Sequence, residues 1–284
     1  MNNFSNGMKV ISADKIKDTV SKLCIQANTV LRKDILAQLK VAHLKETDKR
    51  AKKILKAIIE NAAIAAKEKL AICQDTGLPV VFLEIGQDVN ITGDLRRAIN
   101  KGVEEGYRRG YLRNSIISNP LSRGKPGYSP AVIYTEIVRG NRLKIAVLPK
   151  GFGCENKTQL KMFNPTVKIS EIEKFITDAV KSAGPDACPP YVVGVGIGGT
   201  ADCAMFLAKK ALLRGLYAKR YPLYAKLESD LLKKINKLNI GPMGLGGKTT
   251  CLGVNIETYP THIAGLPVAV NISCHALRSA AKTL

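Results

Sequence analysis

Three cysteines with a common setting are the residues in this sequence best suited to carry chemistry. Cys73, Cys188 and Cys274 each lie in a loop that adjoins an apolar, strand-like run. Thiolates that converge from three distant loops can bind an iron–sulfur cluster and leave one iron open to substrate as a Lewis acid. Cysteine is also common in protein cores. The pattern is therefore compatible with a cluster site and with three buried structural cysteines.

The loop around Cys73 is dense in functional groups. Its sequence, CQDTG, adds the amide of Gln74, the carboxylate of Asp75 and the hydroxyl of Thr76 just before an apolar run that predicts a strand. Polar groups gathered on a loop are typical of binding and catalytic sites. The alternative is a turn in which Asp75 and Thr76 bond the local backbone, while Gly77 supplies a left-handed conformation.

The segment 187–213 predicts a strand, a glycine-rich turn and a helix that starts at Thr200. Unpaired N–H groups at a helix start favour anions, so we expect chemistry near this turn. The glycines of GVGIGG fit a dinucleotide-binding fingerprint, but a basic, helical stretch stands where the fingerprint needs a strand ending in an acidic residue. A GKT triplet at 247–249 lacks the upstream glycine of a P-loop. Neither nucleotide site is favoured.

Alternating helical and strand-like patterns predict the elements that position these loops. Apolar residues recur at helical spacing over 12–44, with Ser12 as the N-cap, and a second helix is expected from a Thr47 cap. The pattern predicts an α/β fold of mixed α+β character, in which sheets flanked by helices form two lobes around a loop-bound site. We expect one catalytic domain over 1–284, with a helical part at about 10–70 and sheet-containing lobes at about 71–284. Further expected elements are a basic helix at 94–109, a β-hairpin around Gly140–Asn141, a helix opened by the capping box Ser170–Glu173, and a helix at 221–238.

The composition limits the classes of function. The net charge of +21 favours anionic partners, although lysines that alternate with apolar residues are typical of solvated helix faces. A basic nucleic-acid-binding protein is a remote alternative, because the few aromatic residues are scattered. The sequence contains no apolar run long enough to cross a membrane and no apolar signal-peptide core near its start. Seven cysteines without a CxxC pair indicate reduced thiols, and we expect a cytoplasmic protein.

Several long motifs occur in a fixed order and extend the analysis to a known family. They are CQDTG, PKGFGCEN, CPPYVVGVGIGGT, GLGG and PTHIAGLPVAVNISCHALR. Together they resemble the alpha subunit of class I fumarate hydratase and of L-tartrate dehydratase. The resemblance covers nearly the whole chain and is strongest from Leu70 to Arg278. PTHIAGLPVA is more similar to the fumarase branch, so fumarase is the expected member and tartrate dehydratase the close alternative.

The resemblance implies a cofactor, a reaction and a set of site residues. It implies a 4Fe–4S cluster bound by Cys73, Cys188 and Cys274, with an open iron for the substrate's hydroxyl and carboxylate. The expected reaction is the reversible hydration of fumarate to L-malate. The residues that would face the dicarboxylate are Gln74, Asp75, Arg113, Gly153 and His262, with Asp75 helping the base. Adding water to fumarate requires a Lewis acid, donors for two carboxylates and a base, which this set supplies with the cluster.

The resemblance also implies a partner. The family's remaining substrate arginines, a lysine and the hydroxyl thought to act as base lie in a beta region that this sequence does not contain. We therefore expect a separate beta subunit, an αβ or α2β2 assembly, and little turnover by this chain alone. The resemblance does not assign the other cysteines as ligands: Cys154 stands where fumarase-type relatives more often have serine, and Cys24, Cys203 and Cys251 are expected in the core. His275 is expected either to donate a hydrogen bond to a group beside the cluster ligands, without binding the cluster itself, or to lie on the surface.

Overall fold

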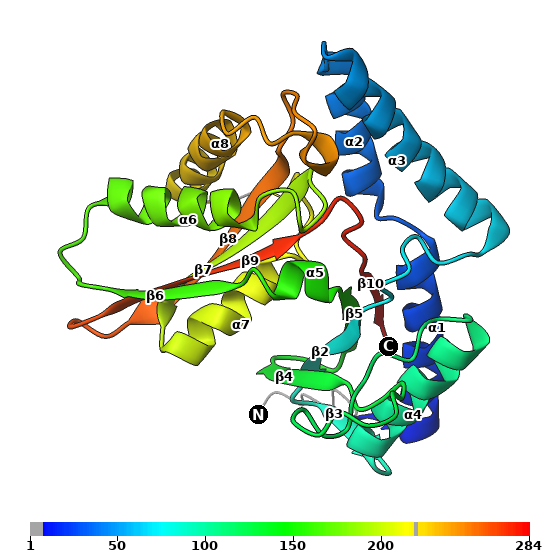
Figure 1. The fold of residues 1–284 in the computed structure, drawn as a ribbon. Coiled ribbons are helices and arrows are strands. Elements are labelled where there is room, and N and C mark those ends of the chain that lie inside the picture. Colours follow the sequence, from blue (N-terminus) through cyan, green and yellow to red (C-terminus); the bar gives the residue numbers. More distant parts are fainter. Residues whose placement is uncertain (1–7, 219–220) are drawn as a thin grey trace. The chain divides into compact units, whose positions relative to one another are not determined.

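The computed structural model describes residues 8–218 and 221–284 (Figure 1). The chain forms two compact units, each assembled from separated stretches of sequence. Unit 1 contains Met1–Leu31, Ile64–Lys150 and Arg278–Leu284, and unit 2 contains Arg32–Ala63 and Gly151–Leu277. None of the helices in the described ranges is long and apolar enough to cross a membrane. The mixed helix and sheet content confirms the predicted fold class.

Unit 1 is built on a four-stranded sheet with the order β10-β5-β2-β4, beside a two-stranded parallel sheet of β1 and β3. Helix α1 packs against β5 and β10, and helix α4 packs against α1. Their apolar faces bury Ile16, Val20 and Ile99 against Val81 and Ile145 of the sheet. The elements are β1 (Lys9–Ser12), α1 (Ala13–Thr29), β2 (Leu78–Gly86), β3 (Val89–Thr92), α4 (Leu95–Arg109), β4 (Val132–Val138), β5 (Leu143–Lys150) and β10 (Ala280–Thr283).

The predicted β-hairpin around Gly140–Asn141 is wrong, although both of its strands exist. Strand β2 lies between β4 and β5, parallel to β4 and antiparallel to β5. The connection at 139–142 crosses the end of β2, where Asp88 N donates to the Gly140 carbonyl (3.0 Å). Alternating apolar residues predict each strand, but they do not indicate that an earlier strand will insert between the two.

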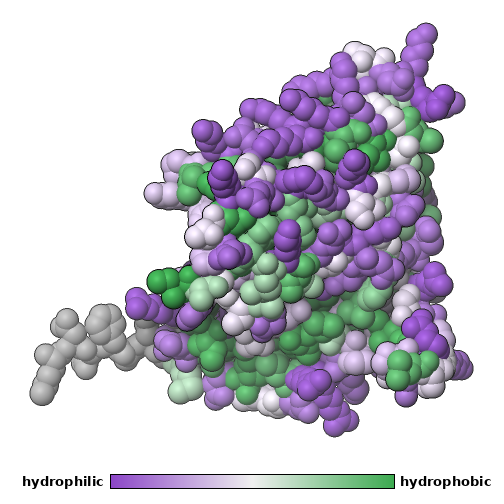
Figure 2. All heavy atoms as spheres, turned by 60° about the vertical axis from the view of Figure 1, so that its left-hand side comes forward, coloured by the Kyte–Doolittle hydropathy of each residue, from purple (hydrophilic) through white to green (hydrophobic). Residues whose placement is uncertain are grey.

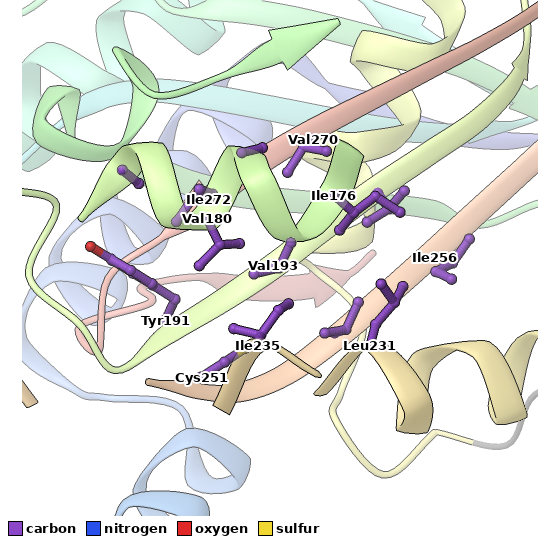
Figure 3. Packing of buried hydrophobic residues seen from close by; sticks show 14 of the residues in the cluster. Ile176, Val180, Tyr191, Val193, Leu231, Ile235, Cys251, Ile256, Val270 and Ile272 are labelled. Atoms are coloured by element: carbon purple, nitrogen blue, oxygen red, sulfur yellow. The ribbon is translucent and has the colours of Figure 1, made fainter. Parts of the chain in front are cut away.

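Unit 2 contains the second four-stranded sheet, with the order β6-β9-β7-β8. Helices α6 and α8 bury one face of it in a continuous apolar core, seen in Figure 3. Helix α7 packs against β7 with Ala204 and Ala208 in a separate small cluster with Ala269. The elements are α2 (Lys33–Lys45), α3 (Lys49–Glu68, whose last residues belong to unit 1), α5 (Phe152–Glu155), β6 (Gln159–Phe163), α6 (Ile169–Ala183), β7 (Tyr191–Gly199), α7 (Ala201–Ala211), α8 (Pro222–Asn236), the short 3-10 helix η1 (Pro242–Gly244), β8 (Cys251–Thr261) and β9 (Leu266–Ser273).

The single helix predicted over 12–44 is two helices. Ser12 caps α1 as predicted, by accepting a hydrogen bond from Lys15 N (3.3 Å). The chain then becomes extended at Val30, and α2 begins after Arg32. The Arg32 guanidinium donates to the carbonyls of Leu212 (2.6 Å) and Arg214. These long-range bonds hold the break in place, although the apolar periodicity continues across it.

Two predicted helix caps also need correction. Asp48, not Thr47, caps α3, because its Oδ1 accepts from Ala51 N (2.8 Å). Helix α6 begins at Ile169, so Ser170 lies inside it, and Lys168 occupies the N-cap position without a side-chain hydrogen bond. The helices predicted at 94–109 and 221–238 are confirmed as α4 and α8.

The basic side chains lie mainly on solvated faces. In α3, Lys52, Lys53 and Lys56 are exposed while Leu55 and Ile58 are buried. Hydrophilic side chains spread widely over the face seen in Figure 2. This confirms that much of the excess charge belongs to the outer faces of amphipathic helices.

Candidate functional site

The CQDTG loop of unit 1 is a tight, internally bonded turn. Gly77 has a positive φ of 74°, and a Cβ at this position would lie 2.6 Å from the Pro149 carbonyl carbon. Asp75 Oδ1 accepts a hydrogen bond from Gly77 N (3.0 Å), as the turn interpretation predicts. Thr76 is buried and bonds the distant Arg113 instead of the local backbone: Arg113 N donates to Thr76 Oγ1 (3.0 Å).

A buried tyrosine holds this loop by a hydrogen bond to its backbone. Tyr107 projects from α4, is 1% exposed, and donates its hydroxyl hydrogen to the Thr76 carbonyl (2.8 Å). Burial raises the pKa of the Tyr107 hydroxyl, and the nearby Cys24 thiol adds to this. The phenol therefore remains protonated and serves as a donor.

Unit 1 thus brings four of the predicted site residues together. Cys73 and Asp75 are half-buried, and Gln74 and Arg113 are exposed. The Cys73 thiol lies 3.6 Å from Gln74 Oε1. The Thr76 bonds hold the Arg113 backbone beside the turn. The backbone of Arg113 is consequently held next to the loop that carries the thiol, the amide and the carboxylate.

Cys188 in unit 2 has an unusual backbone conformation. Its φ is 57°, and its N–H donates to the Pro185 carbonyl (3.1 Å). The loop is fixed on both sides of the cysteine: Cys154 Sγ donates to the Ala187 carbonyl (3.3 Å), and Met243 N donates to the Pro189 carbonyl (2.8 Å). A non-glycine residue in the left-handed region is uncommon and requires such support.

Cys274 lies at the same edge of the sheet as Cys188. Val192, in the second position of β7, pairs with Ser273, the last residue of β9. The following His275 contacts the Cys188 carbonyl through both its backbone N (3.4 Å) and its ring Nδ1 (3.1 Å). Two of the three predicted cluster ligands are therefore neighbours within unit 2.

The Gly153 loop is anchored to the same sheet by a polar network. Glu155, at the end of α5, accepts hydrogen bonds from Lys209 Nζ (2.5 Å) and from Asn271 Nδ2 (2.9 Å). Asn271 is 1% exposed and lies three residues before Cys274. Gly153 itself is exposed, and a Cβ there would approach no atom closer than 3.9 Å.

His262 and Thr200 lie at the opposite end of this sheet. Thr200 follows the last residue of β7, whereas Cys188 precedes the first. His262 lies in the turn after β8, next to Thr261, which pairs with Gly199. Because β9 spans eight residues between this turn and Cys274, His262 and Cys274 are about 25 Å apart. The Thr200 turn therefore lies at the other end of β7 from the Cys188 loop, and chemistry near this turn stays a prediction.

The glycines of the GVGIGG stretch serve packing. A Cβ on Gly194 would lie 2.1 Å from the Ala208 carbonyl oxygen, and one on Gly196 would lie 2.0 Å from that of Ala204. Both glycines therefore let the backbone of α7 approach β7. This close helix–strand contact explains the fingerprint-like spacing without a dinucleotide.

The remaining cysteines divide by burial. Cys24 and Cys251 are core residues as predicted, and burial raises the pKa of each thiol to about 12. Cys154 is also buried. The expectation that Cys203 lies in the core needs correction: it is only half-buried on α7, at the start of the helix beside the turn at Gly199.

The three candidate thiols are divided between the two units. Among the described residues, no group of three His, Cys, Asp or Glu side chains is arranged to hold a metal ion. Cys73 belongs to unit 1, while Cys188 and Cys274 belong to unit 2, so neither unit alone contains the three thiols. All three are half-buried, and none of them is in a disulfide among the residues that the structure describes. In chemical type they fit an iron–sulfur cluster.

Sequence reasoning did not identify the residues that support the thiol loops. Tyr107 and Glu155 look like ordinary members of amphipathic segments, and their contacts are visible only in three dimensions. His275 carried a signal, since it adjoins a candidate ligand and the chain has only three histidines.

This chain matches one protein family and several curated proteins over nearly its whole length. The family model described as fumarate hydratase (fumerase) matches residues 17–283. The chain is 42% identical over 279 residues to "Putative L(+)-tartrate dehydratase subunit alpha" of Methanocaldococcus jannaschii, covering 95% of this chain and 98% of that protein. It is 29% identical over 280 residues to L(+)-tartrate dehydratase subunit alpha of Escherichia coli, covering 97% of this chain and 92% of that protein. A Shigella sonnei protein of the same name matches at the same identity and coverage.

Proposed function

Because the chain belongs to the fumarate hydratase family, we propose that it is the cluster-binding subunit of a hydro-lyase acting on a four-carbon dicarboxylate. The observation that carries this proposal is the pair Cys188 and Cys274, which two distant stretches of unit 2 bring to one edge of one sheet. Cys73, beside the functional groups of the CQDTG loop, would be the third ligand. These three residues would hold a 4Fe–4S cluster, which when bound supplies a Lewis acid at the iron that has no cysteine.

The CQDTG loop, Arg113 and Gly153 together offer groups that can bind a dicarboxylate and accept a proton. Arg113 offers a planar, permanently charged donor for a carboxylate, and the Gln74 amide can donate to a second oxygen. Asp75 can accept a proton, and its hydrogen bond from Gly77 N holds the carboxylate in place. Gly153 leaves room for substrate to approach the backbone.

His262 belongs to this proposal only in an assembly with more than one copy of the chain. Its turn and Cys274 lie at opposite ends of β9, about 25 Å apart, which no side chain spans. A His262 that faces substrate must therefore come from a second copy. Between the two expected assemblies, this favours α2β2 over αβ.

Two substrates remain candidates, each with its own support. Fumarate is supported by the family model, and the PTHIAGLPVA motif resembles the fumarase branch. L(+)-tartrate is supported at least as well, by the names of the relatives matched over nearly their full length. Both would use the same thiols and the same dicarboxylate donors.

The test combines cofactor and substrate. The chain is reconstituted anaerobically with iron and sulfide, and Cys73→Ser, Cys188→Ser and Cys274→Ser are compared with Cys203→Ser as the control. About four irons per chain, lost in the three variants and retained in the control, is the expected result. Iron retained equally in all four variants would contradict the ligand assignment.

The substrate is decided by activity measurements with the beta subunit added. Hydration of fumarate and dehydration of L(+)-tartrate are followed with the same reconstituted sample. We expect one substrate to be clearly preferred and little turnover by the chain alone. Fast turnover by the pure chain, with no second polypeptide present, would overturn the two-subunit proposal.

A further inference from the structure

His275 connects the two loops that carry Cys188 and Cys274. Its ring Nδ1 lies 3.1 Å from the Cys188 carbonyl oxygen, and its backbone N lies 3.4 Å from the same atom. Both cysteines lie beyond Val192 and Ser273, which form the last pair between β7 and β9 at this end. The strand ladder therefore does not reach them, and the His275 contacts join the loops directly.

The chemistry of this contact fixes the imidazole tautomer. A carbonyl oxygen can only accept a hydrogen bond, so Nδ1 must carry the hydrogen that points to Cys188. Of the two contacts, the ring bond is the shorter, and the backbone bond is close to the limit of a useful hydrogen bond. Removing the ring donor would therefore remove the shorter of the two contacts between His275 and the Cys188 carbonyl.

The conformation of Cys188 makes this support important. With a φ of 57°, the backbone of this residue is in the left-handed region, which residues other than glycine rarely adopt. Its N–H donates to the Pro185 carbonyl, and its own carbonyl oxygen takes both contacts from His275. A strained backbone persists only where the surroundings determine it.

We propose that His275 is a positioning residue that sets the separation of the Cys188 and Cys274 thiols through its Nδ1–H donor. The biological role of this positioning rests on the proposed function: two thiols held at a fixed separation would be ready to bind two irons of a cluster. It concerns the apo chain equally, because the hydrogen bond joins two protein groups.

Two isosteric variants isolate the donor. Asn places its amide nitrogen where His275 has Nδ1, whereas Gln places its nitrogen near the position of Nε2. We expect His275→Asn to release cluster iron to a chelator within about twofold of the wild-type rate, and His275→Gln to release it about fivefold faster. His43→Gln on α2 is the matched control and should release iron at the wild-type rate. Equal rates for His275→Asn and His275→Gln would overturn the proposal.

A second readout needs no cluster. A bifunctional trivalent arsenical cross-links two thiols only when they are close together, and mass spectrometry of the digested apo chain identifies the joined peptides. We expect the Cys188–Cys274 cross-link in the wild type and in His275→Asn, and about fivefold less of it in His275→Gln. If the wild type binds no iron but shows this dependence, the proposed function fails and the role of His275 stands. If cross-linking is equal in all variants, the positioning role is excluded whatever the iron content.

Discussion

The sheets of the two units repeat one topology with different contents. In unit 1 the order is β10-β5-β2-β4, and in unit 2 it is β6-β9-β7-β8. In both, one strand lies between the next two strands in sequence, parallel to one and antiparallel to the other: β2 lies between β4 and β5, and β7 lies between β8 and β9. Each of these central strands, β2 and β7, is preceded by a candidate ligand, Cys73 or Cys188.

The contents differ most along the central strands. Leu78 and Val192 occupy matching positions, because each pairs with the last residue of the antiparallel neighbour. Two and four residues later, β2 has Val80 and Phe82, whereas β7 has Gly194 and Gly196. The two glycines of β7 leave room for the backbone of α7 to approach the strand. At the matching positions of β2, the side chains of Val80 and Phe82 are buried and occupy this space. The same strand arrangement thus places a cysteine loop before the central strand in both sheets, although a helix packs closely on that strand through glycines in unit 2.

The largest expected effect tests the close approach of α7. Gly196→Ala would place a methyl group 2.0 Å from the Ala204 carbonyl oxygen, so helix and strand must separate. We expect a loss of about 3 kcal/mol in the free energy of unfolding, measured with urea. Gly127→Ala is the control, since its added Cβ would be 3.9 Å from the nearest atom. An unchanged urea midpoint in Gly196→Ala would contradict the packing role.

The next prediction compares ion pairs in the two units. In unit 2, Arg32 and Asp34 are mostly buried, and Asp34 Oδ2 also accepts from Leu216 N (3.0 Å). Burial alone would raise the pKa of Asp34, but the Arg32 hydrogen bonds and charge lower it overall. Because the folded pKa lies below the unfolded one, the stabilisation is present above about pH 4 and is lost as the pH falls through the folded value.

The measurement for this pair is urea unfolding across the acid range. Asp34→Asn should cost about 2 kcal/mol at neutral pH and should remove this part of the acid dependence. In unit 1 the more exposed Lys144–Glu84 pair provides the contrast, and Glu84→Gln should cost less than about 1 kcal/mol. Equal losses for the two variants would show that burial is not the deciding factor.

A smaller effect is expected from the tyrosines that support the two thiol loops. Tyr107 donates to the Thr76 carbonyl below Cys73, and Tyr191 donates to the Gly184 carbonyl before Cys188. Each Tyr→Phe change removes one hydrogen bond and should cost about 1 kcal/mol. Alkylation of the apo chain should become faster at Cys73 in Tyr107→Phe and at Cys188 in Tyr191→Phe. Faster alkylation of both thiols in either variant would mean that the loops are not supported separately.

The smallest effect concerns the core thiols, one in each unit. Cys24 and Cys251 have pKa values raised to about 12 by burial, so at pH 8 only about one in ten thousand is a thiolate. We expect no label on either from iodoacetamide in the folded apo chain, while Cys73, Cys188 and Cys274 react. Labelling of Cys24 alone would indicate that unit 1 opens more readily than unit 2.

Local patterns in the sequence predict most elements but not their neighbours. Helices α4 and α8 and the strand after Cys73 follow from periodicity, and Ser12 was identified as a cap. The strands β4 and β5 look like a hairpin in sequence, yet β2 separates them, and β7 likewise separates β8 from β9. The position of His262 relative to Cys274 depends on that separation and on strand length. Strand order results from contacts distant in sequence, which local periodicity does not record.

The thiol loops show the same limit at the level of single residues. The residue types of CQDTG are compatible with chemistry and with a structural turn, and the bond from Gly77 N to Asp75 agrees with the turn interpretation. The attachment of Thr76 to Arg113 and of His275 to Cys188 joins residues far apart in the chain. Such contacts follow from the fold and could not be predicted before it was known.

The discontinuity of unit 1 gives the chain an order of assembly during synthesis. Strand β10 pairs with β5, and Leu284 N donates to the Leu143 carbonyl (2.8 Å), but all of Gly151–Leu277 is translated between these partners. Unit 2 can therefore fold while the edge of β5 still lacks its neighbour. Translation proceeds at about 5–20 residues per second, so this edge stays open for several seconds on the ribosome. In that interval the nascent chain presents an unpaired strand edge, the kind of surface that invites aggregation.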